Sequence, residues 1–484
     1  MDNRELEFSW RPEKLHEECG VFGINSIDGH DCAKITYYAL YALQHRGQQS
    51  SGIAVNDDGN IIYKKDMGLV PDVFDDSVLS NLKGSMAVGH VNYTRVNKGF
   101  KESAQPMVRE YRKGTLTIAN NGSLVNSHDL RIGLEDAGVV FHGTSDAEVI
   151  INVIARERIS SNSVEEAVNK MMKIIKGSYS MVVMTPGKLI GCRDPYGMRP
   201  LALGKLDNSY ILSSESCAFD AIGAEFIRDL EPGEIVVIKN GTVESIRDNV
   251  TDNRNICIFE YIYFARPDSV IEGTSVYEAR KNAGKVLAEE HPVEADLVFG
   301  VPDSGLCAAI GYSEASGIPY GYGLIKNRYI GRTFIQPSQS ERQNLVKIKL
   351  NVLADAVKGK RVVMVDDSIV RGTTIRNIVR MLKEAGALEV HVRISSPPFM
   401  YPCYFGTDVP SKENLAACRM SLDEIRQSIE ADSLGYLSIE GIKKLLPGRT
   451  GGYCQGCFTG EYPMEVPEGC GKENNERRIF TYER

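Results

Sequence analysis

The chain has 484 residues, 42% hydrophobic and 25% charged, which predicts two or three folded domains and excludes a wholly disordered protein. No apolar run approaches the 18 residues of a membrane span, and residues 1–18 lack the apolar centre of a secretory signal, so we expect a cytoplasmic protein. The net charge of −8 argues against nucleic acid as the main partner, because nucleic-acid binding requires a basic face.

The first half of the chain is predicted to form short strands separated by turns, with one early helix. Residues 34–44 carry apolar side chains at helical spacing, which predicts an amphipathic helix. Its expected buried face consists of Ile35, Tyr38, Ala39 and Leu43. Further along, residues 180–184 and 189–192 flank the turn sequence TPGK and predict a β-hairpin.

The pattern changes after the polar run 247–255, which predicts a domain boundary. Residues 297–301 and 362–365 are short apolar runs, each followed by a small-residue loop and a helical pattern. That order is typical of buried parallel strands in βαβ units. Ser421 and Glu424 have the spacing of a capping box at a helix start. The second half is therefore predicted to be built on a parallel sheet.

The sequence VVMVDDSIVRGTT, residues 362–374, carries a strong chemical signal. A strand ends in two aspartates, and a loop of small and hydroxyl residues leads to a helix start, where backbone N–H groups can hold a phosphate. The carboxylates suit ribose hydroxyls and Mg²⁺, which prefers oxygen ligands. The candidate binding residues are Asp366, Asp367, Ser368, Gly372, Thr373 and Thr374.

This segment resembles the 5-phosphoribosyl-1-pyrophosphate (PRPP) motif of type I phosphoribosyltransferases. Its exact sequence is similar to that of the amidophosphoribosyltransferase family. CIFEYIYFARPDS (257–269) and KNRYIGRTFIQP (326–337) match that family's domain entry and flexible loop, and the resemblance covers nearly the whole chain. It implies that Ser304, in GVPDSG, contacts Mg²⁺ together with Asp366 and Asp367. It also implies a basic set that stabilises the diphosphate leaving group. That set is Lys326, Arg328 and Arg332.

The string EECGVFGI places Cys19 after an 18-residue leader. The family resemblance implies that this leader is a propeptide, whose removal leaves Cys19 as the first residue of the mature chain. A free α-amine has a pKa of about 8 and can act as base for its own thiol, which an internal amide cannot do. The thiolate would attack the carboxamide of glutamine, release ammonia and form a thioester.

Four further strings resemble the N-terminal nucleophile glutaminase domain. They are LQHRGQ (43–48), NNGSL (120–124), TSDAE (144–148) and RDPYGMRPL (193–201). The resemblance implies that Asn121 and Gly122 form the oxyanion hole, in which a side-chain amide and a backbone N–H meet the developing negative charge. It implies that Asp146 holds the α-amino group of the substrate.

The chain departs from this family at the substrate-recognition residues. Asn92 stands where the family has the arginine that binds the α-carboxylate of glutamine, Asn120 replaces a histidine, and Gln49 replaces a common acid. Loss of an arginine–carboxylate fork costs about 1.5–3 kcal/mol, or roughly tenfold to a hundredfold in glutamine binding. Arg95 is the candidate that would reach into the same place, so it joins Asp146 as an expected glutamine-binding residue.

The 11 cysteines are scattered through a large chain, where buried groups, metal ligands and nucleophiles are more common than disulfides. Cys454 and Cys457 have CxxC spacing, which alone fits zinc, a redox pair or chance. The resemblance adds Cys257 and Cys403, and the four match the iron–sulfur subclass of the family, which carries a [4Fe–4S] cluster. Four thiolates suit either this cluster or structural zinc.

Three functions follow from these patterns. The leading one is a two-site enzyme that hydrolyses glutamine at Cys19 and passes ammonia internally to the PRPP site, giving 5-phosphoribosylamine and pyrophosphate, the first committed step of purine biosynthesis. A second is a transferase fed by free ammonia, with the glutaminase impaired through Asn92. A third is a non-catalytic PRPP-binding regulator. A glutamine-dependent sugar-phosphate aminotransferase shares the first domain but would lack residues 362–374.

The resemblance also implies an overall organisation. After the propeptide, residues 1–18, we expect a four-layer αββα glutamine amidotransferase domain over 19–255. A doubly wound α/β phosphoribosyltransferase domain over 256–470 and a C-terminal tail over 471–484 would follow. A homotetramer and feedback inhibition by purine nucleotides are implied by the same resemblance.

Overall fold

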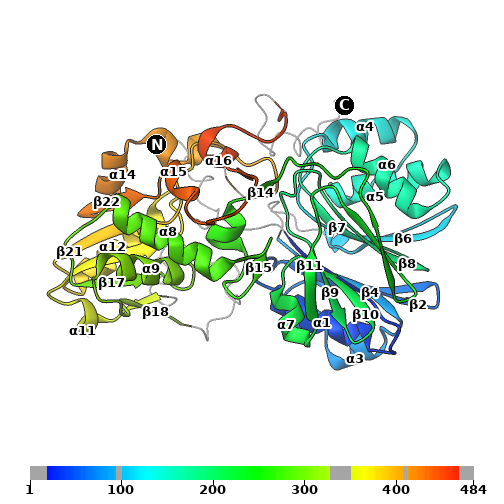
Figure 1. The fold of residues 1–484 in the computed structure, drawn as a ribbon, viewed down its shortest axis with the longest axis horizontal. Coiled ribbons are helices and arrows are strands. Elements are labelled where there is room, and N and C mark those ends of the chain that lie inside the picture. The colour runs from blue at the N-terminus through cyan, green and yellow to red at the C-terminus, as the bar shows by residue number, and fades with distance from the viewer. Residues whose placement is uncertain (1–18, 94–100, 328–349, 408, 410, 468–484) are drawn as a thin grey trace, which may run out of the picture.

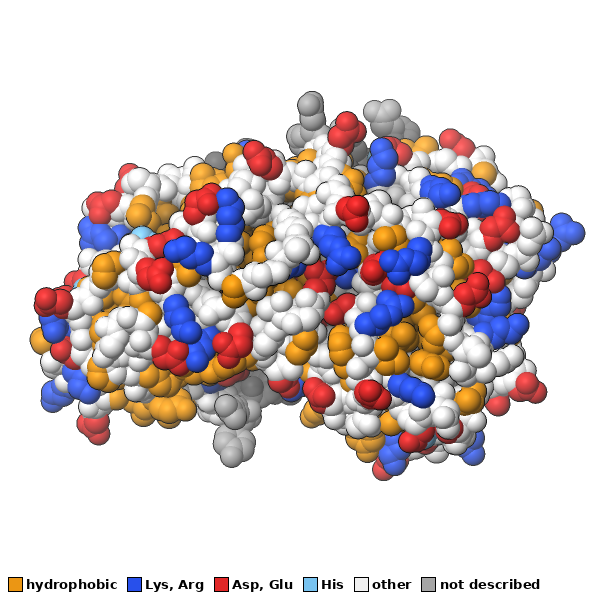
Figure 2. All heavy atoms as spheres, viewed as in Figure 1, with side chains coloured by type: hydrophobic (Ala, Val, Ile, Leu, Met, Phe, Trp, Pro, Cys, Tyr) orange, Lys and Arg blue, Asp and Glu red, His pale blue; other side chains and the backbone are white. Residues whose placement is uncertain are grey.

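The computed structural model describes residues 19–93, 101–327, 350–407, 409 and 411–467. These residues form two lobes side by side (Figure 1). The strands up to residue 246 build one lobe, and the elements from residue 255 onward build the other. None of the described helices is long and apolar enough to cross a membrane. Acidic and basic side chains are interspersed over the face shown in Figure 2.

The first lobe contains two antiparallel sheets packed face to face. The larger sheet, in spatial order, consists of β11 (Glu225–Asp229), β9 (Ala202–Leu206), β10 (Ser209–Ser213), β1 (Cys19–Asn25), β4 (Met86–Asn92), β2 (Ser50–Asp57) and β3 (Asn60–Met67). The smaller consists of β13 (Thr242–Ile246), β12 (Ile235–Lys239), β8 (Lys188–Arg193), β7 (Ser180–Thr185), β6 (Gly114–Asn121) and β5 (Met107–Tyr111). The β7–β8 pair confirms the predicted hairpin.

Helices cover the outer faces of both sheets. On β1, Val21 joins the core between the sheets, whereas Phe22 packs with the helices outside, as strand alternation requires. The helices on the larger sheet are α1 (Cys32–Ala42) and α7 (Cys217–Ile222), with the short α2 (Val70–Val73) and α3 (Asp76–Ser80) nearby. Those on the smaller sheet are α4 (Ser127–Asp136), α5 (Asp146–Ile159) and α6 (Val164–Ile174), and η1 (Lys101–Ser103) precedes β5. The predicted αββα order is confirmed.

The predicted early helix forms as α1, but the face assigned to it was partly wrong. Asp31 begins the helix, because its side chain accepts a hydrogen bond from the Lys34 N–H. Tyr38 was expected to be buried and is 49% exposed. Thr36 and Leu40 face the sheet instead, and a Cβ added to Gly89 would lie 2.4 and 2.9 Å from them. This close approach to a glycine determines which face is buried.

The second lobe is built on four parallel strands with helices on both faces, which confirms the predicted doubly wound sheet. In spatial order they are β17 (Leu297–Gly300), β20 (Arg361–Asp366), β21 (Glu389–Ile394) and β22 (Ser433–Tyr436). Val363 and Val365 of β20 pack with α8 (Val276–Glu290) and α9 (Leu306–Ser316). Val362 and Met364 pack with α12 (Thr373–Glu384) on the opposite face.

Short elements complete this lobe. They are β14 (Asn255–Cys257), η2 (Glu260–Phe264), β15 (Val270–Ile271), β16 (Thr274–Ser275), β18 (Leu324–Lys326), β19 (Leu350–Val352), α11 (Ala354–Val357), η3 (Lys412–Asn414), α13 (Ala416–Arg419), α14 (Leu422–Ser428), α15 (Ile439–Ile442), β23 (Gly452–Cys454) and α16 (Gly456–Thr459). The predicted capping box is present at the start of α14. β14 pairs in parallel with β23 near the junction of the lobes (Figure 1).

Candidate active sites

Cys19 is the first residue of β1 and its side chain is buried. In the strand register it lies opposite Asn92 of β4, and its Sγ donates a hydrogen bond to Asn92 Oδ1 at 3.2 Å. The Cys19 carbonyl accepts from Arg46 Nε at 3.2 Å. Asn92, which the sequence marks as a missing substrate contact, therefore touches the proposed nucleophile itself.

The predicted oxyanion residues stand at the end of β6. Gly122 has a φ of 127°, and a Cβ there would lie 2.3 Å from the Ser178 carbonyl oxygen, so only glycine fits. The Asn121 side chain is fully buried, and neither of its amide atoms has a hydrogen-bond partner among the described residues. A buried amide without a hydrogen-bond partner costs about 1–3 kcal/mol of folding free energy. This cost is consistent with an Asn121 amide that donates to an oxygen of a bound ligand.

Asp146, the predicted partner of the substrate amine, is fastened to the same turn. It is the first residue of α5, and its Oδ2 accepts hydrogen bonds from Ser123 Oγ at 3.0 Å and from the Leu124 N–H at 2.9 Å. Ser123 and Leu124 directly follow Gly122. The structure thus brings the expected amine-binding carboxylate to the expected oxyanion hole.

Two side chains that sequence reasoning missed hold the strand before Asn121. Gln105 Oε1 accepts from the Asn120 N–H at 2.7 Å, and Gln105 Nε2 donates to the Asn120 carbonyl at 3.3 Å. The same carbonyl accepts from His90 Nε2 at 3.1 Å. His90 lies on β4, two residues before Asn92, so this contact joins the two sheets beside the nucleophile. The sequence signal that could have identified His90 is its place two residues before Asn92, in the string GHVNY (89–93).

The predicted PRPP and Mg²⁺ residues converge at the carboxyl end of β20. Ser304 Oγ donates to Asp366 Oδ1 at 3.2 Å, and that oxygen also accepts from the Asp367 N–H at 3.0 Å. Ser368 Oγ donates to Asp367 Oδ2 at 2.5 Å. Both aspartates are buried. Two carboxylates and a hydroxyl therefore form an oxygen donor set that suits Mg²⁺.

Close backbone packing places the neighbouring loop against this set. A Cβ on Gly305 would lie 2.1 Å from the Val365 carbonyl oxygen, which holds the 300–305 loop against β20. Gly372, with a φ of 92°, is the N-cap of α12, whose first residues are Thr373 and Thr374. Strand ends and a helix N-terminus thus meet where open α/β sheets bind phosphorylated ligands.

Lys326 is joined to the same loop, because its Nζ donates to Asp303 Oδ2 at 2.6 Å. It is the one member of the predicted basic set for which a position is described. Arg328 and Arg332 lie outside the described residues, as does Arg95 of the glutaminase site. Their roles remain predictions.

Comparison with known proteins finds a matching domain family in each lobe. Residues 94–221 match the glutamine amidotransferase domain family, and residues 273–395 match the phosphoribosyl transferase domain family. The chain is 50% identical over 451 residues to the amidophosphoribosyltransferase of Archaeoglobus fulgidus, covering 93% of this chain and 98% of that protein. It is 49% identical over 458 residues to that of Bacillus subtilis, covering 93% and 95%. The chain belongs to the amidophosphoribosyltransferase family.

Two solved structures share the fold over nearly their whole length. One is described as the allosteric regulatory enzyme of purine biosynthesis, with a TM-score of 0.88, 48% identity and coverage of 93% of this chain and 97% of that one. The other is the glutamine PRPP amidotransferase of Bacillus subtilis complexed with ADP and GMP, with a TM-score of 0.87, 48% identity and coverage of 93% and 98%. The function predicted from the sequence, an amidophosphoribosyltransferase at the first step of purine biosynthesis, is confirmed.

Within this amidophosphoribosyltransferase fold, the four predicted cluster cysteines line one cavity near the lobe junction. Cys257 lies opposite Cys454 in the β14–β23 pair, and Cys457 lies in the first turn of α16, just after β23. The remaining lining residues are Cys403, Met198, Arg199, Phe259, Phe405, Thr407 and Tyr462. Burial raises the pKa of the Cys257 thiol to about 12 and those of Cys454 and Cys457 well above their usual range, and the neighbouring thiols of the set reinforce these shifts.

The contact of His90 with Asn120 leads to a prediction about pH. Burial lowers the pKa of His90 to about 4, from 6.5, so the folded protein holds it neutral, with its proton on Nε2. The unfolded chain binds a proton near pH 6.5, and stability is therefore lost as pH falls from 6.5 towards 4. Between pH 7 and pH 5, the native protein should lose about 1–2 kcal/mol more unfolding free energy than His90→Gln. Denaturant unfolding at both pH values measures this, and equal losses would contradict it.

Proposed function

We propose that the chain converts PRPP, glutamine and water to 5-phosphoribosylamine, glutamate and pyrophosphate, with glutamine hydrolysed at Cys19 and the transfer completed at the Asp366–Asp367 site. The observation that supports glutamine use is the buried amide of Asn121, which has no hydrogen-bond partner within the described part of the chain and lies on the same turn that binds Asp146. A side chain in that state is costly unless it serves a ligand. It supports a working oxyanion hole in the first lobe.

At the first site, the Cys19 thiolate attacks the carboxamide carbon, and the α-amine of Cys19 takes the thiol proton once the 1–18 leader is removed. Asn121 Nδ2 and the Gly122 N–H donate to the oxygen that becomes negative. Asp146 pairs with the α-ammonium group of the substrate. The α-amine returns the thiol proton to the amide nitrogen, which leaves as ammonia when the C–N bond breaks, and water then cleaves the thioester to give glutamate and the free thiol.

At the second site, ammonia attacks C1 of PRPP while the C1–O bond to pyrophosphate breaks. Lys326 and the arginines after it supply positive charge to the leaving group. Ser304, Asp366 and Asp367 would hold Mg²⁺, which neutralises diphosphate charge when bound. The N-terminus of α12 and the hydroxyls of Thr373 and Thr374 bind the 5-phosphate.

The deciding experiment is PRPP-dependent pyrophosphate release by anaerobically purified protein, with glutamine and ammonium chloride supplied separately. Turnover with both donors supports the proposal. Turnover with ammonium alone keeps the transferase and rejects the glutaminase. The absence of pyrophosphate release with both donors would reject catalysis and favour the PRPP-binding regulator.

Asn92 favours the ammonia-fed enzyme as a second candidate, because a neutral amide replaces the family's carboxylate-binding arginine. Asn92→Arg should lower the KM for glutamine by roughly tenfold to a hundredfold, since it restores a charge-assisted fork. The ammonium-dependent rate should stay the same. Steady-state kinetics with both donors checks this, and an unchanged KM for glutamine would show that another group already binds the carboxylate.

We further propose a [4Fe–4S] cluster bound by Cys257, Cys403, Cys454 and Cys457. Four thiols that line one cavity suit thiolate ligation, and Arg199 at the cavity wall favours the charged form of Cys257. Four thiolates could also hold structural zinc, and the match of the four cysteines to the family's iron–sulfur subclass favours the cluster. About four iron and four sulfide per chain are expected. Cys457→Ser should lose them together with visible absorption, and stoichiometric zinc instead would reject the cluster.

Family membership supports three remaining proposals, which are a homotetramer, cleavage of the leader before Cys19, and inhibition by purine nucleotides. The Bacillus subtilis structure, at 48% identity, was solved with ADP and GMP. Light scattering tests the assembly, intact-mass spectrometry tests the cleavage, and titration of turnover with GMP and ADP tests the inhibition.

A further inference from the structure

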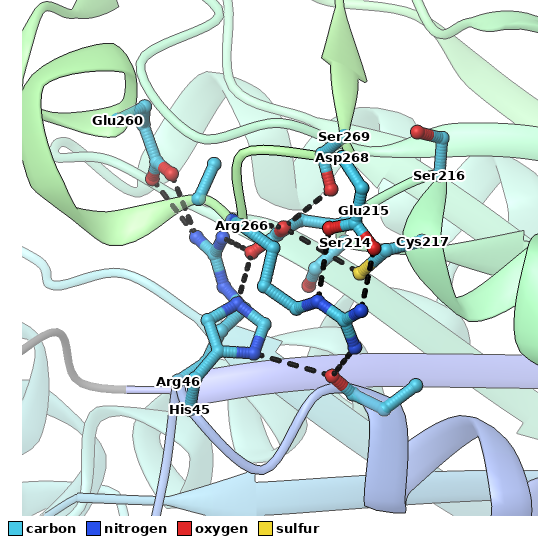
Figure 3. Close-up of polar contacts among 12 residues, drawn as sticks. His45, Arg46, Ser214, Glu215, Ser216, Cys217, Glu260, Arg266, Asp268 and Ser269 are labelled. Carbon is cyan, nitrogen blue, oxygen red and sulfur yellow. Dashed lines mark hydrogen bonds and ion pairs between the residues drawn. The ribbon is translucent and has the colours of Figure 1, made fainter. Parts of the chain in front are cut away.

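A chain of buried charges connects the two lobes, and Figure 3 shows its members Arg46, Glu215 and Glu260. Arg46, in the loop after α1, donates from Nη2 to both carboxylate oxygens of Glu260, at 3.0 and 2.9 Å. Arg199 Nη1 donates to Glu260 Oε1 at 3.0 Å. All three side chains are at most 1% exposed. Glu260 is the first residue of η2, so a carboxylate of the second lobe is bound by two arginines of the first.

The same Arg46 guanidinium holds the backbone of the proposed nucleophile. Its Nε donates to the Cys19 carbonyl at 3.2 Å, and its Nη1 binds Glu215. Glu215 is itself held by His45 Nε2 at 2.8 Å and Ser269 Oγ at 2.7 Å. Because a guanidinium is planar and rigid, carboxylates on two of its nitrogens determine where the third points.

The backbone position of Cys19 depends on the hydrogen bond from Arg46, because Cys19 lies at the end of β1. The contacts of β1 with β10 end at Val21, whose N–H donates to Ser214 Oγ and whose carbonyl accepts from the Ser214 N–H. Beyond that point, on the β10 side, the Cys19 carbonyl is met by Arg46. The position of the nucleophile on that side therefore follows the position of the guanidinium.

We propose that Glu260 is a positioning residue of the glutaminase site, which orients Arg46 and thereby places Cys19 relative to the transferase lobe. This inference rests on the proposed function of Cys19. A misplacement of about 1 Å at a nucleophile can cost on the order of a hundredfold in rate. Glu260→Gln keeps the shape of the side chain and removes the charge that orients Arg46.

Glu272 offers a matched control at the same junction. It also lies in the second lobe, is 10% exposed, and bridges Arg193 of the first lobe at 2.7 Å and Arg449 at 2.5 Å. This bridge resembles that of Glu260 in burial and partners, but it is formed by arginines that do not contact Cys19. Glu272→Gln therefore removes an interlobe charge bridge without disturbing Arg46.

The experiment compares the full-length native protein with Glu260→Gln and Glu272→Gln. Alkylation by iodoacetamide is followed by mass spectrometry at Cys19 and at Cys192, a buried cysteine on β8. In Glu260→Gln we expect Cys19 to react at least about fivefold faster, because its backbone is held less tightly, and Cys192 to react unchanged. Glutamine-dependent kcat should fall at least about tenfold, with the ammonium-dependent rate within about twofold. Glu272→Gln should leave the reactivity of Cys19 unchanged.

Unchanged reactivity of Cys19 in Glu260→Gln would overturn the inference, and so would a parallel rise at Cys192, which reports a general loosening of the lobe. If the native protein uses ammonium and not glutamine, the proposed glutaminase fails, while alkylation still decides the role of Glu260. If Glu260→Gln does not fold, the double variant Arg199→Met with Glu260→Gln removes one buried charge of each sign, and the same rise in the reactivity of Cys19, with Cys192 unchanged, is expected of it.

Discussion

Replacing Asn121 by alanine is expected to lower glutamine-dependent turnover by about 10²- to 10³-fold, because one of two oxyanion donors is removed. The ammonium-dependent rate should be unchanged, since that reaction bypasses the first lobe. Folding should suffer little, because the Asn121 amide has no hydrogen-bond partner among the described residues. Steady-state kinetics with each donor in turn provides the measurement.

The matched control for this variant is Asn126→Ala, five residues along the same segment. Asn126 holds backbone groups, donating to the Ile174 carbonyl at 3.0 Å and accepting from the Lys176 N–H at 2.8 Å. Its loss should reduce stability by about 1 kcal/mol and leave turnover with glutamine nearly native. If Asn121→Ala lowered both donor reactions equally, or if Asn126→Ala lost as much glutamine turnover, the oxyanion role would be wrong.

Asp366→Asn is expected to reduce turnover with both donors by roughly 10³-fold, because the transfer step is common to them. The buried Asp366 carboxylate joins Ser304 Oγ to the Asp367 backbone, and it supplies half of the negative charge in the predicted Mg²⁺ donor set. Electrostatic stabilisation by a bound metal is worth several kcal/mol, so removing one of its charged ligands has an effect of this size. Pyrophosphate release over a range of Mg²⁺ concentrations measures the loss.

Asp296→Asn is the corresponding control. Asp296 precedes β17 at the opposite end of the same sheet and pairs with Arg361 at 3.0 Å on the surface. Because water screens an exposed ion pair, its loss costs little, so turnover should remain within about twofold of native. Retention of turnover by Asp366→Asn with either donor would show that the carboxylates do not serve the transfer.

The chemistry of contiguous segments could be predicted from the order of amino acids alone. Residues 362–374 predicted a strand, two carboxylates and a helix start, and β20 and α12 confirm this order. The capping box at Ser421 and the hairpin of β7 and β8 were predicted for the same reason. Each depends on bonds and periodicity within a few residues, which the order of amino acids specifies directly.

Which distant polar groups meet depends on how the chain folds in three dimensions. The sequence predicts only that Asn92 marks a lost substrate contact, whereas its hydrogen bond to the Cys19 thiol depends on the β1–β4 register across 73 residues. The bond of Arg46 to Glu260 spans 214 residues and two lobes. Tyr38 is exposed because Thr36 and Leu40, on another face of α1, pack against Gly89 of the sheet. Such pairings follow from how the sheets and lobes pack together. Burial makes an unpaired polar group costly, so these groups are paired with whatever partner the packing brings near. The physical cause of the pairings is therefore the assembled fold and not the local sequence pattern.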